Sequence, residues 1–501
     1  MGNGPIQSAV IPPVRVRYAP SPTGYPHVGN IRTAMFNWLF ARHYGGSFIV
    51  RIEDTDVERK VEGAVEDILG SLRWLGLEWD EGPEVVGEYG PYIQSQRLKL
   101  YHPAAQQLVR DGYAYPCYCP TERLEAMRAE QMRRGQPPGY DRHCRNLGQQ
   151  ERSRLEYQEI TPVIRFKAPL TGRTQFRDLI RGKVGFENST LDDFVLLKSD
   201  GYPTYHLANV VDDHSMQISH VLRADEWLAS TPRHILLYQA LGYQPPHFAH
   251  LPMILGPDRS KLSKRHGATS LLEFRDEGYL PQAMLNYLAL LGWSLDDRTE
   301  LFSREELISH FSLERLSKAA AIFDVEKLRW MNGVYIRRLS VEELTEKALP
   351  FFEKHLPAQV IRPLDRDYVY QVVSLEQERA RTLAELPQPQ LAEFFFVEDL
   401  DYPDPDELLR SIGMTREKST EALSTALKRL QSLQPFDHDS LEALLRSLAT
   451  ELSLKTRELF GLLRVAITGR TAAPPLFSTM VVLQKGRCLH RIEAVLNLLQ
   501  G

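Results

Sequence analysis

The sequence predicts an α/β protein in which a doubly wound parallel sheet is split by an insertion and followed by all-α regions. Residues 14–92 alternate between strand-like and helix-like segments, including an apolar strand over 47–52 and an amphipathic helix over 64–75. Residues 93–199 change to basic helices and short strands, so they interrupt the sheet. Beyond residue 340 the chain becomes leucine-rich with helical spacing, which predicts helical packing.

The stretch from Val14 to Phe40 reads as a strand, a tight turn and a helix. Alternating apolar and polar residues indicate the strand, and the prolines and the glycine that follow must end it. Apolar residues then recur at helical spacing, which places His27 and Asn30 at the helix start. Free backbone N–H groups and the positive end of the helix dipole make this position favourable for a phosphate group.

A second segment with related chemistry lies far along the chain. Lys261 and Lys264 flank Ser263 directly after a Gly/Pro loop at 255–260. Two ammonium groups placed in this way can grip a triphosphate and stabilise the charge that develops as it reacts. His-Val-Gly-Asn alone is also what an ordinary turn looks like, so the prediction of a nucleotide site depends on both segments.

Together the two segments resemble the paired signatures of class I aminoacyl-tRNA synthetases. Four longer motifs are similar to those of bacterial glutamyl-tRNA synthetases: SPTGYPHVGNIRTA at 21–34, RIEDTD at 51–56, GYPTYHLANVVDDH at 201–214 and KLSKRHGA at 261–268. The resemblance runs from about Arg15 to the end of the chain. It has one departure, because Asn30 stands where the first signature usually has histidine, a variation that occurs among glutamyl enzymes.

The resemblance implies an enzyme that joins L-glutamate to tRNA(Glu). ATP, accompanied by Mg²⁺, would activate glutamate as a glutamyl-adenylate, and the 3′-terminal adenosine of the tRNA would then take the acyl group. Such transfers need alignment and charge stabilisation more than a protein nucleophile. By resemblance, the catalytic residues are His27, Lys261 and Lys264, and the ATP-binding residues are His27, Gly29, Asn30, Lys261, Ser263 and Lys264. The glutamate-binding residues are Arg17, Ala19, Ser21, Glu53, Tyr205, Asn209 and Arg223.

Arg15 and Arg17 lie on one side of the first strand, where an unpaired cation would be costly. We therefore expect at least one of them to contact an anion, which is either a structural carboxylate or the side chain of the substrate. In the implied pocket, arginine and tyrosine face the substrate's side-chain carboxylate, and Glu53 faces its amino group. Glutamine would leave buried arginine uncompensated, so the pocket should select glutamate.

The resemblance also predicts the domains: a mobile leader over 1–13, a split Rossmann catalytic domain over 14–92 and 200–258, an acceptor-binding insertion over 93–199, a helical stem-contact domain over 259–339, and a helical anticodon-binding module over 340–501 with a break near 397. Residues 201–211, GYPTYHLANVV, are expected to be strand-like. Asp324 is expected to begin a helix that ends at Asn332 and Gly333.

Composition limits the other classes of function. A chain of 501 residues with 43% hydrophobic and 25% charged residues is ordinary for a soluble enzyme. The net charge of -5 argues against non-specific adhesion to nucleic acid, although basic surfaces can exist locally. No apolar run is long enough to span a membrane, and residues 1–13 lack the features of a signal or transit peptide. We expect a cytoplasmic protein, and we expect it to be a monomer.

Cys117, Cys119 and Cys144 have a spacing with which some relatives bind zinc. Those relatives place a histidine two residues after the third cysteine, where this chain has Asn146, and His143 would have to approach from another direction. Because three ligands do not close a structural tetrahedral site, we expect less than one zinc ion per chain. Four cysteines in so long a chain also argue against a disulfide framework.

Other functions share parts of the pattern. Nucleotidylyltransferases use a similar His-x-Gly turn but are usually shorter. A silent RNA-binding relative would not need the lysine segment, and truncated enzymes that modify a tRNA base lack the helical module.

Within the family, some members also charge tRNA(Gln). Arg379 aligns with an arginine that, in relatives, reads the third anticodon base. A guanidinium only donates hydrogen bonds, so it favours the acceptors of C in glutamate tRNA over the donors of G.

Overall fold

The computed structural model describes residues 13–158, 160–263, 270–402 and 413–500. The chain forms two compact units. The first consists of Met1–Glu273 and Met284–Asp324, and the second consists of Phe274–Ala283 and Val325–Gly501.

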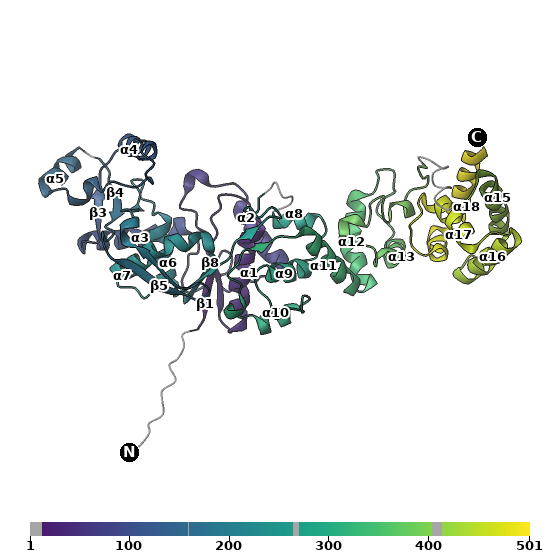
Figure 1. Ribbon diagram of the computed structural model, residues 1–501, viewed down its shortest axis with the longest axis horizontal. Helices are drawn as coiled ribbons and strands as arrows, with labels where there is room; N and C mark the ends of the chain where they lie inside the picture. The colour runs from purple at the N-terminus through teal and green to yellow at the C-terminus, as the bar shows by residue number, and fades with distance from the viewer. Residues whose placement is uncertain (1–12, 159, 264–269, 403–412, 501) are drawn as a thin grey trace, which may run out of the picture. The chain divides into compact units, whose positions relative to one another are not determined.

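A six-stranded sheet with the order β2-β1-β8-β9-β5-β6 forms the centre of the first unit (Figure 1). Its strands are β1 (Arg15–Tyr18), β2 (Ser47–Val50), β5 (Arg173–Asp178), β6 (Gly182–Glu187), β8 (His220–Ala224) and β9 (His247–Leu251). Neighbouring strands run parallel except β5 and β6, which form an antiparallel hairpin. The predicted α/β fold with a parallel sheet is therefore confirmed.

Two βαβ crossovers build this sheet. Helix α1 (Val28–His43) joins β1 to β2, and α7 (Thr231–Leu241) joins β8 to β9. Helix α1 packs against β1, β2 and β8, whereas α3 (Leu98–Arg110), α6 (Tyr205–Ser215) and α7 pack against one another. The amphipathic helix predicted over 64–75 is α2 (Ala64–Leu75).

The insertion contributes a second, smaller sheet. Strands β3 (Ala114–Cys117), β4 (Val163–Phe166) and β7 (Val195–Leu197) pair antiparallel in the order β3-β4-β7, beside α4 (Thr121–Arg133) and α5 (Gln149–Tyr157) (Figure 1). The hairpin of β5 and β6 lies within the predicted insertion by sequence, yet it continues the main sheet through the pairing of Asp178 with Phe248 on β9. The insertion and the catalytic sheet therefore share a hydrogen-bonded edge.

The prediction of a strand over residues 201–211 is wrong, because α6 begins at Tyr205. Thr204, with extended backbone angles, precedes the helix, and Leu207, Ala208, Val210 and Val211 are all buried. A helix buried on several sides carries an almost continuous apolar sequence with β-branched residues, so its period could not be distinguished from that of a buried strand.

The remaining elements of the first unit are short. They include β10 (Ile254–Leu255) and β11 (Ala321–Ile322), which pair in parallel, and α10 (Arg304–His310). Helices α8 (Leu271–Asp276) and α9 (Pro281–Leu290) contain residues of both units.

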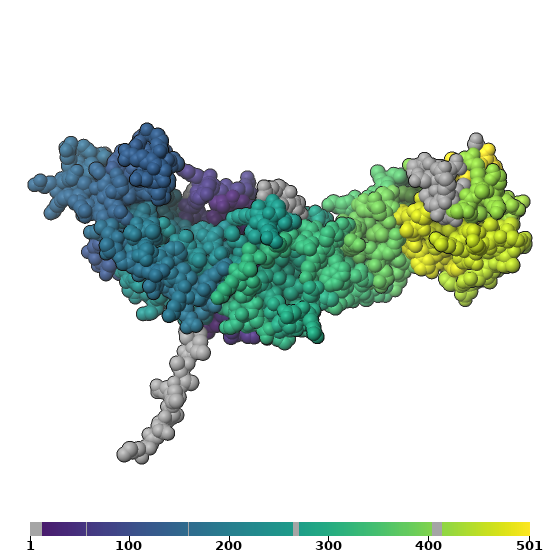
Figure 2. All heavy atoms as spheres, in the orientation of Figure 1, coloured from purple at the N-terminus to yellow at the C-terminus, as the bar shows by residue number. Residues whose placement is uncertain are grey.

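The second unit is helical throughout its described residues. Its helices are α11 (Val325–Arg338), α12 (Val341–His355), α13 (Arg366–Glu376), α15 (Arg416–Ser432), α16 (His438–Glu451), α17 (Thr456–Thr468) and α18 (Leu476–Gln500). The predicted leucine faces lie in a common core with Leu423, Leu430, Leu441, Leu445 and Leu448 buried. This unit, green to yellow in Figure 2, thus has its own apolar core.

The prediction that α11 ends at Asn332 and Gly333 is wrong, because the helix continues to Arg338. Asn332 is buried and uses its side chain elsewhere: Oδ1 accepts from the backbone N–H of Leu280 at 2.8 Å, and Nδ2 donates to the carbonyl of Arg381 at 2.6 Å. A Cβ on Gly333 would lie 3.4 Å from the carbonyl oxygen of Ala380. The two residues thus serve close packing of another segment and do not end the helix.

In the described parts of the chain, no helix combines the length and apolarity needed to cross a membrane.

Candidate active site

His27 is the residue that caps α1 after the predicted turn. Its backbone is extended, with φ -94° and ψ 161°, and its Nδ1 accepts a hydrogen bond from the backbone N–H of Gly29 at 3.1 Å. Since Nδ1 accepts, Nε2 carries the ring proton and can donate to an anion. Burial of the ring is the larger cause that lowers the pKa of His27, and the nearby Lys261 ammonium lowers it further. The imidazole is therefore neutral at pH 7.

A cavity of about 770 Å³ opens beside His27, where β1 and β8 end. The carboxyl ends of parallel strands are where open α/β sheets bind their ligands, and the volume is that of a small-molecule site. The structure brings together on its wall every residue predicted to bind glutamate, namely Arg17, Ala19, Ser21, Glu53, Tyr205, Asn209 and Arg223. Asn30 also lines this cavity, whereas Gly29 does not.

The lysine segment lies beside the cavity. Lys261 does not line the wall, but its Nζ is 2.7 Å from Oε2 of Glu226, which does. His27 pairs with Ser270 in an isolated β-bridge, so the chain that follows the lysine segment passes the start of α1. A group bound at the helix start would therefore lie near both predicted signatures.

Two further predicted nucleotide-binding residues belong to this segment. Ser263 belongs to the part of the chain that the structure describes, but it does not line the cavity. Lys264 lies outside the described residues, so its predicted catalytic role stays a prediction.

Arg17 and Glu53 belong to a buried network of charges beside the cavity. Arg17 donates from Nε to Oδ1 of Asp213 at 3.0 Å. Arg51 donates to the same oxygen at 2.7 Å and to Oε1 of Glu53 at 2.9 Å. Two cations thus compensate two carboxylates, so the charge of Arg17 is already balanced by the protein. The roles of Arg51 and Asp213 could not be predicted from the sequence, because the pairing of Arg17 with Asp213 spans 196 residues.

Arg15 has a structural partner as well, since its guanidinium donates two hydrogen bonds to the carboxylate of Glu81 at 2.8 and 3.0 Å. The expectation that at least one of Arg15 and Arg17 contacts an anion is confirmed for both. Glu53 has a second neighbour in Asn209, whose Nδ2 donates to Oε1 at 3.3 Å. Burial raises the pKa of Glu53, and Arg51 opposes this shift.

Arg223, at the end of β8, differs from Arg17 because its partners are neutral. Its guanidinium is 5% exposed and donates to five acceptors: His250 Nε2 at 3.1 Å, the Tyr205 hydroxyl at 2.9 Å, His234 Nδ1 at 3.3 Å, Thr231 Oγ1 at 2.8 Å and the Trp227 carbonyl at 3.3 Å. Among the described residues, no carboxylate forms an ion pair with it. A buried cation of this kind would be stabilised by a carboxylate that binds in the cavity.

Tyr205 can connect such a carboxylate to Arg223. Its hydroxyl oxygen accepts from Arg223, so its own proton is available for donation into the cavity. Burial raises the pKa of Tyr205, which keeps this proton in place. The pocket thus combines a buried positive charge with a hydrogen-bond donor.

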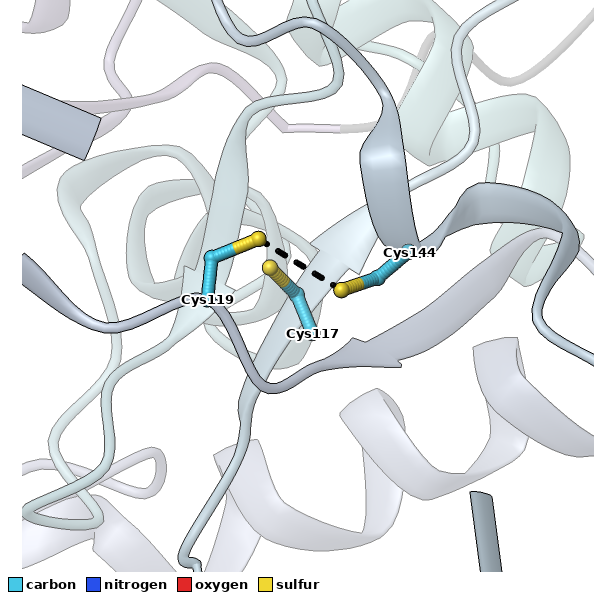
Figure 3. A group of neighbouring side chains, drawn as sticks. All are labelled: Cys117, Cys119 and Cys144. Atoms are coloured by element: carbon cyan, nitrogen blue, oxygen red, sulfur yellow. Dashed lines mark hydrogen bonds between the residues drawn. The ribbon is translucent and has the colours of Figure 1, made fainter. Parts of the chain in front are cut away.

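The three predicted cysteines form a second cluster, in which the sulfur atoms of Cys117, Cys119 and Cys144 face one another (Figure 3). Their Sγ atoms lie within 4.8 Å of one another, and those of Cys119 and Cys144 are 3.5 Å apart. The Tyr140 hydroxyl lies 3.2 Å from the Cys117 sulfur and 3.4 Å from the Cys119 sulfur. The Tyr140 hydroxyl is therefore a fourth candidate donor beside the three sulfur atoms, which the spacing of the cysteines, Asn146 and His143 did not indicate.

Arg379, the predicted anticodon residue, lies in the turn directly after α13. Its Nη1 contacts both carboxylate oxygens of Glu376, at 2.8 and 3.1 Å, and the Glu376 side chain is fully buried. The Arg379 side chain remains 32% exposed. The guanidinium is thus held by a buried acid while part of it faces solvent.

Comparison with known proteins defines the class. Residues 13–330 match the family "tRNA synthetases class I (E and Q), catalytic domain", and residues 343–496 match "Anticodon binding domain". Together with the parallel sheet and the cavity beside His27, these matches make the chain a class I aminoacyl-tRNA synthetase.

The relatives narrow the class further. The chain is 61% identical over 479 residues to a glutamate–tRNA ligase of Dehalococcoides mccartyi, covering 96% of both chains, and 50% identical to that of Moorella thermoacetica, covering 96% of this chain and 97% of the relative. A crystal structure of a glutamate tRNA ligase from Elizabethkingia meningosepticum in complex with its amino acid is similar, with a TM-score of 0.87, 36% identity and coverage of 97% and 99%. The chain belongs to the glutamate–tRNA ligase family.

Proposed function

We propose that this chain activates L-glutamate with ATP as a glutamyl-adenylate and transfers it to tRNA(Glu), with the cavity beside His27 as the active site. The observation that carries the proposal is Arg223, a buried cation on the cavity wall whose five hydrogen-bond partners are all neutral. Glutamate would supply the missing negative charge, and glutamine would not. The names of the relatives support the same substrate.

The charges assign different roles to the two arginines of the pocket. Arg17 is balanced by Asp213, so we assign it to shaping the pocket and reinforcing its positive field. Tyr205 would donate to the side-chain carboxylate of glutamate, and Arg223 would contact it by exchanging one of its two 3.3 Å hydrogen bonds, to His234 or to the Trp227 carbonyl, for the substrate. Glu53, paired with Arg51, would accept from the substrate's amino group. Ala19 and Ser21, which follow β1, would close the pocket beside the substrate backbone.

ATP would lie between the start of α1 and the lysine segment. The neutral His27 would donate from Nε2 to a phosphate oxygen, the positive end of the α1 dipole at Gly29 and Asn30 would attract the phosphates, and Lys261, Ser263 and Lys264 would hold the leaving pyrophosphate. Mg²⁺ bound with ATP neutralises phosphate charge. These residues align the reacting groups and stabilise charge without forming a covalent intermediate.

We extend the proposal to the tRNA contacts, the oligomeric state and the cellular location. The insertion would hold the acceptor end of the tRNA, residues 259–339 the stem, and the helical unit from about residue 340 the anticodon. The match of residues 343–496 to an anticodon-binding domain supports the last assignment. We also propose that the protein is a monomer, and charging of tRNA for translation supports a cytoplasmic location.

The cluster of three cysteines and Tyr140 has donors that suit zinc, because thiolates bind zinc well and a structural site needs four donors. A zinc ion there would tie the end of β3 to the turn at 143–146. We therefore replace the expectation of less than one zinc per chain with one zinc per chain. Elemental analysis of the purified protein checks this, and a metal-free protein of unchanged melting temperature would contradict it.

Preference for tRNA(Glu) over tRNA(Gln) tests the anticodon assignment. Arg379→Gln should reduce this preference by about tenfold to a hundredfold, because a misread base costs about 1–3 kcal/mol. Glutamine can still donate a hydrogen bond to the buried Glu376, so the fold should persist. Charging of the two transcripts measures the effect.

Arg381 provides the matched control for this experiment. Its side chain is 57% exposed and lies two residues further along, so Arg381→Gln should leave the preference unchanged. Equal charging of both tRNAs by the unmodified enzyme would remove Arg379 from the role of a filter.

A further inference from the structure

The direction in which Arg223 points depends on a buried histidine behind it. The Nε of Arg223 donates to Nε2 of His250, which is completely buried on β9. An imidazole accepts at Nε2 only when the ring is neutral and its proton is on Nδ1. The hydrogen bond to Arg223 therefore requires one particular tautomer of His250.

Asp178 selects that tautomer. Its Oδ2 lies 2.6 Å from Nδ1 of His250, so the carboxylate accepts the Nδ1 proton and leaves Nε2 as the acceptor. Loss of hydration lowers the pKa of His250, whereas hydrogen bonds from His250 and from backbone N–H groups lower the pKa of Asp178. At neutral pH the pair is an ionised carboxylate and a neutral imidazole.

The orientation of the Asp178 carboxylate is fixed by its other partners. Oδ1 accepts from the backbone N–H groups of Ile180 at 2.9 Å and Arg181 at 2.7 Å. Asp178 is itself 1% exposed and ends β5, the strand through which the hairpin of the insertion joins the main sheet. The two hydrogen bonds that join Asp178 on β5, His250 on β9 and Arg223 on β8 thus run across three neighbouring strands to the cavity.

We propose that Asp178 is a positioning residue for glutamate recognition: by fixing the tautomer of His250, it holds Arg223 in the direction in which the guanidinium meets the substrate's carboxylate. This inference rests on the proposed function. It also explains why the charge of Arg223 has no carboxylate in direct contact among the described residues. The imidazole of His250, which is neutral, lies between Arg223 and the carboxylate of Asp178.

Asp178→Asn tests the proposal with almost no change in shape. The asparagine oxygen would stay on the N–H groups of Ile180 and Arg181, so its NH₂ group would take the place of Oδ2 and face Nδ1 of His250 together with the backbone N–H of His250, from which Oδ2 accepts at 3.1 Å. The ring proton would then move to Nε2, where Thr231 Oγ1 lies 3.1 Å away and could accept it, and the Nε–H of Arg223 would lose its acceptor. Because an unpaired buried donor costs about 1–3 kcal/mol, we expect the KM for glutamate to rise about tenfold or more, with the KM for ATP unchanged.

A second substitution separates positioning from stability. In Asp178→Asn combined with His250→Gln, the amide oxygen of glutamine can accept from Arg223 whatever residue 178 presents. We expect this double variant to recover most of the lost glutamate affinity in pyrophosphate exchange with tRNA present. A residue that only stabilised the fold would give a double variant no better than Asp178→Asn alone.

Asp193→Asn is the matched control, because Asp193 is a fully buried aspartate of the insertion that binds Arg145 and Tyr115. It should lower the melting temperature and leave the KM for glutamate unchanged. An unchanged KM in Asp178→Asn, or no recovery in the double variant, would overturn the inference while the unmodified enzyme stays active. Absence of glutamate-dependent exchange in the unmodified enzyme would contradict the proposed function and the inference with it.

Discussion

Arg223→Ala should lower kcat/KM for glutamate by about a thousandfold, since losing one member of a buried charge pair costs about 3–5 kcal/mol. The KM for ATP should stay the same, because the guanidinium contacts no group near the start of α1. The five partners that lose their donor are neutral, so the fold should persist. Pyrophosphate exchange at varied glutamate and at varied ATP measures both effects.

Arg17→Gln gives the comparison for this result. Arg17 is balanced by Asp213, and glutamine can keep a hydrogen bond to that carboxylate while Arg51 keeps the ion pair. Its loss should raise the glutamate requirement, but by less than the loss of Arg223. A larger effect from Arg17→Gln would mean that Arg17 is the principal contact of the substrate's carboxylate.

His27→Asn should lower kcat of the exchange reaction about a hundredfold while the melting temperature stays the same. Asparagine is a good N-cap and can accept from the N–H of Gly29 as Nδ1 of His27 does, so the helix start should be preserved. What it removes is the Nε2 donor, which we expect to act mainly as charge develops on the phosphates, and a lost donor of this kind costs about 2.7–4 kcal/mol. Pyrophosphate exchange at saturating ATP and glutamate, with tRNA present, measures the rate.

His27→Ala completes the comparison. It removes both the cap and the Nε2 donor, so it should show the same loss of rate together with a stability loss of about 0.5–2 kcal/mol. If His27→Asn were as active as the unmodified enzyme, His27 would be a helix cap only, and the catalytic role would fall to the lysine segment.

Features specified by neighbouring residues were predictable from the sequence. The strand, turn and helix around His27 follow from alternation, from Pro and Gly, and from helical spacing, and the bounds of α2 follow from its apolar face. The same local rules failed at α6, where burial on several sides hid the helical period, and at Asn332, whose side chain packs against another segment.

Partners distant in the sequence could not be predicted in the same way. The buried arginines were expected to meet anions, but nothing local identifies Asp213 as the partner of Arg17 or shows that the partners of Arg223 are neutral. Tyr140 was missed as a fourth donor for the cysteines because only the fold brings its hydroxyl to their sulfur atoms. The roles of the two arginines therefore became distinguishable only in three dimensions.

The most direct test of the account is pyrophosphate exchange by the unmodified enzyme with each amino acid in turn, with and without tRNA(Glu). We predict exchange with glutamate that requires the tRNA, and for glutamine a kcat/KM lower by at least about a hundredfold, because the neutral amide leaves Arg223 uncompensated. Exchange with glutamine at a rate similar to that with glutamate, or none with glutamate and tRNA together, would contradict it.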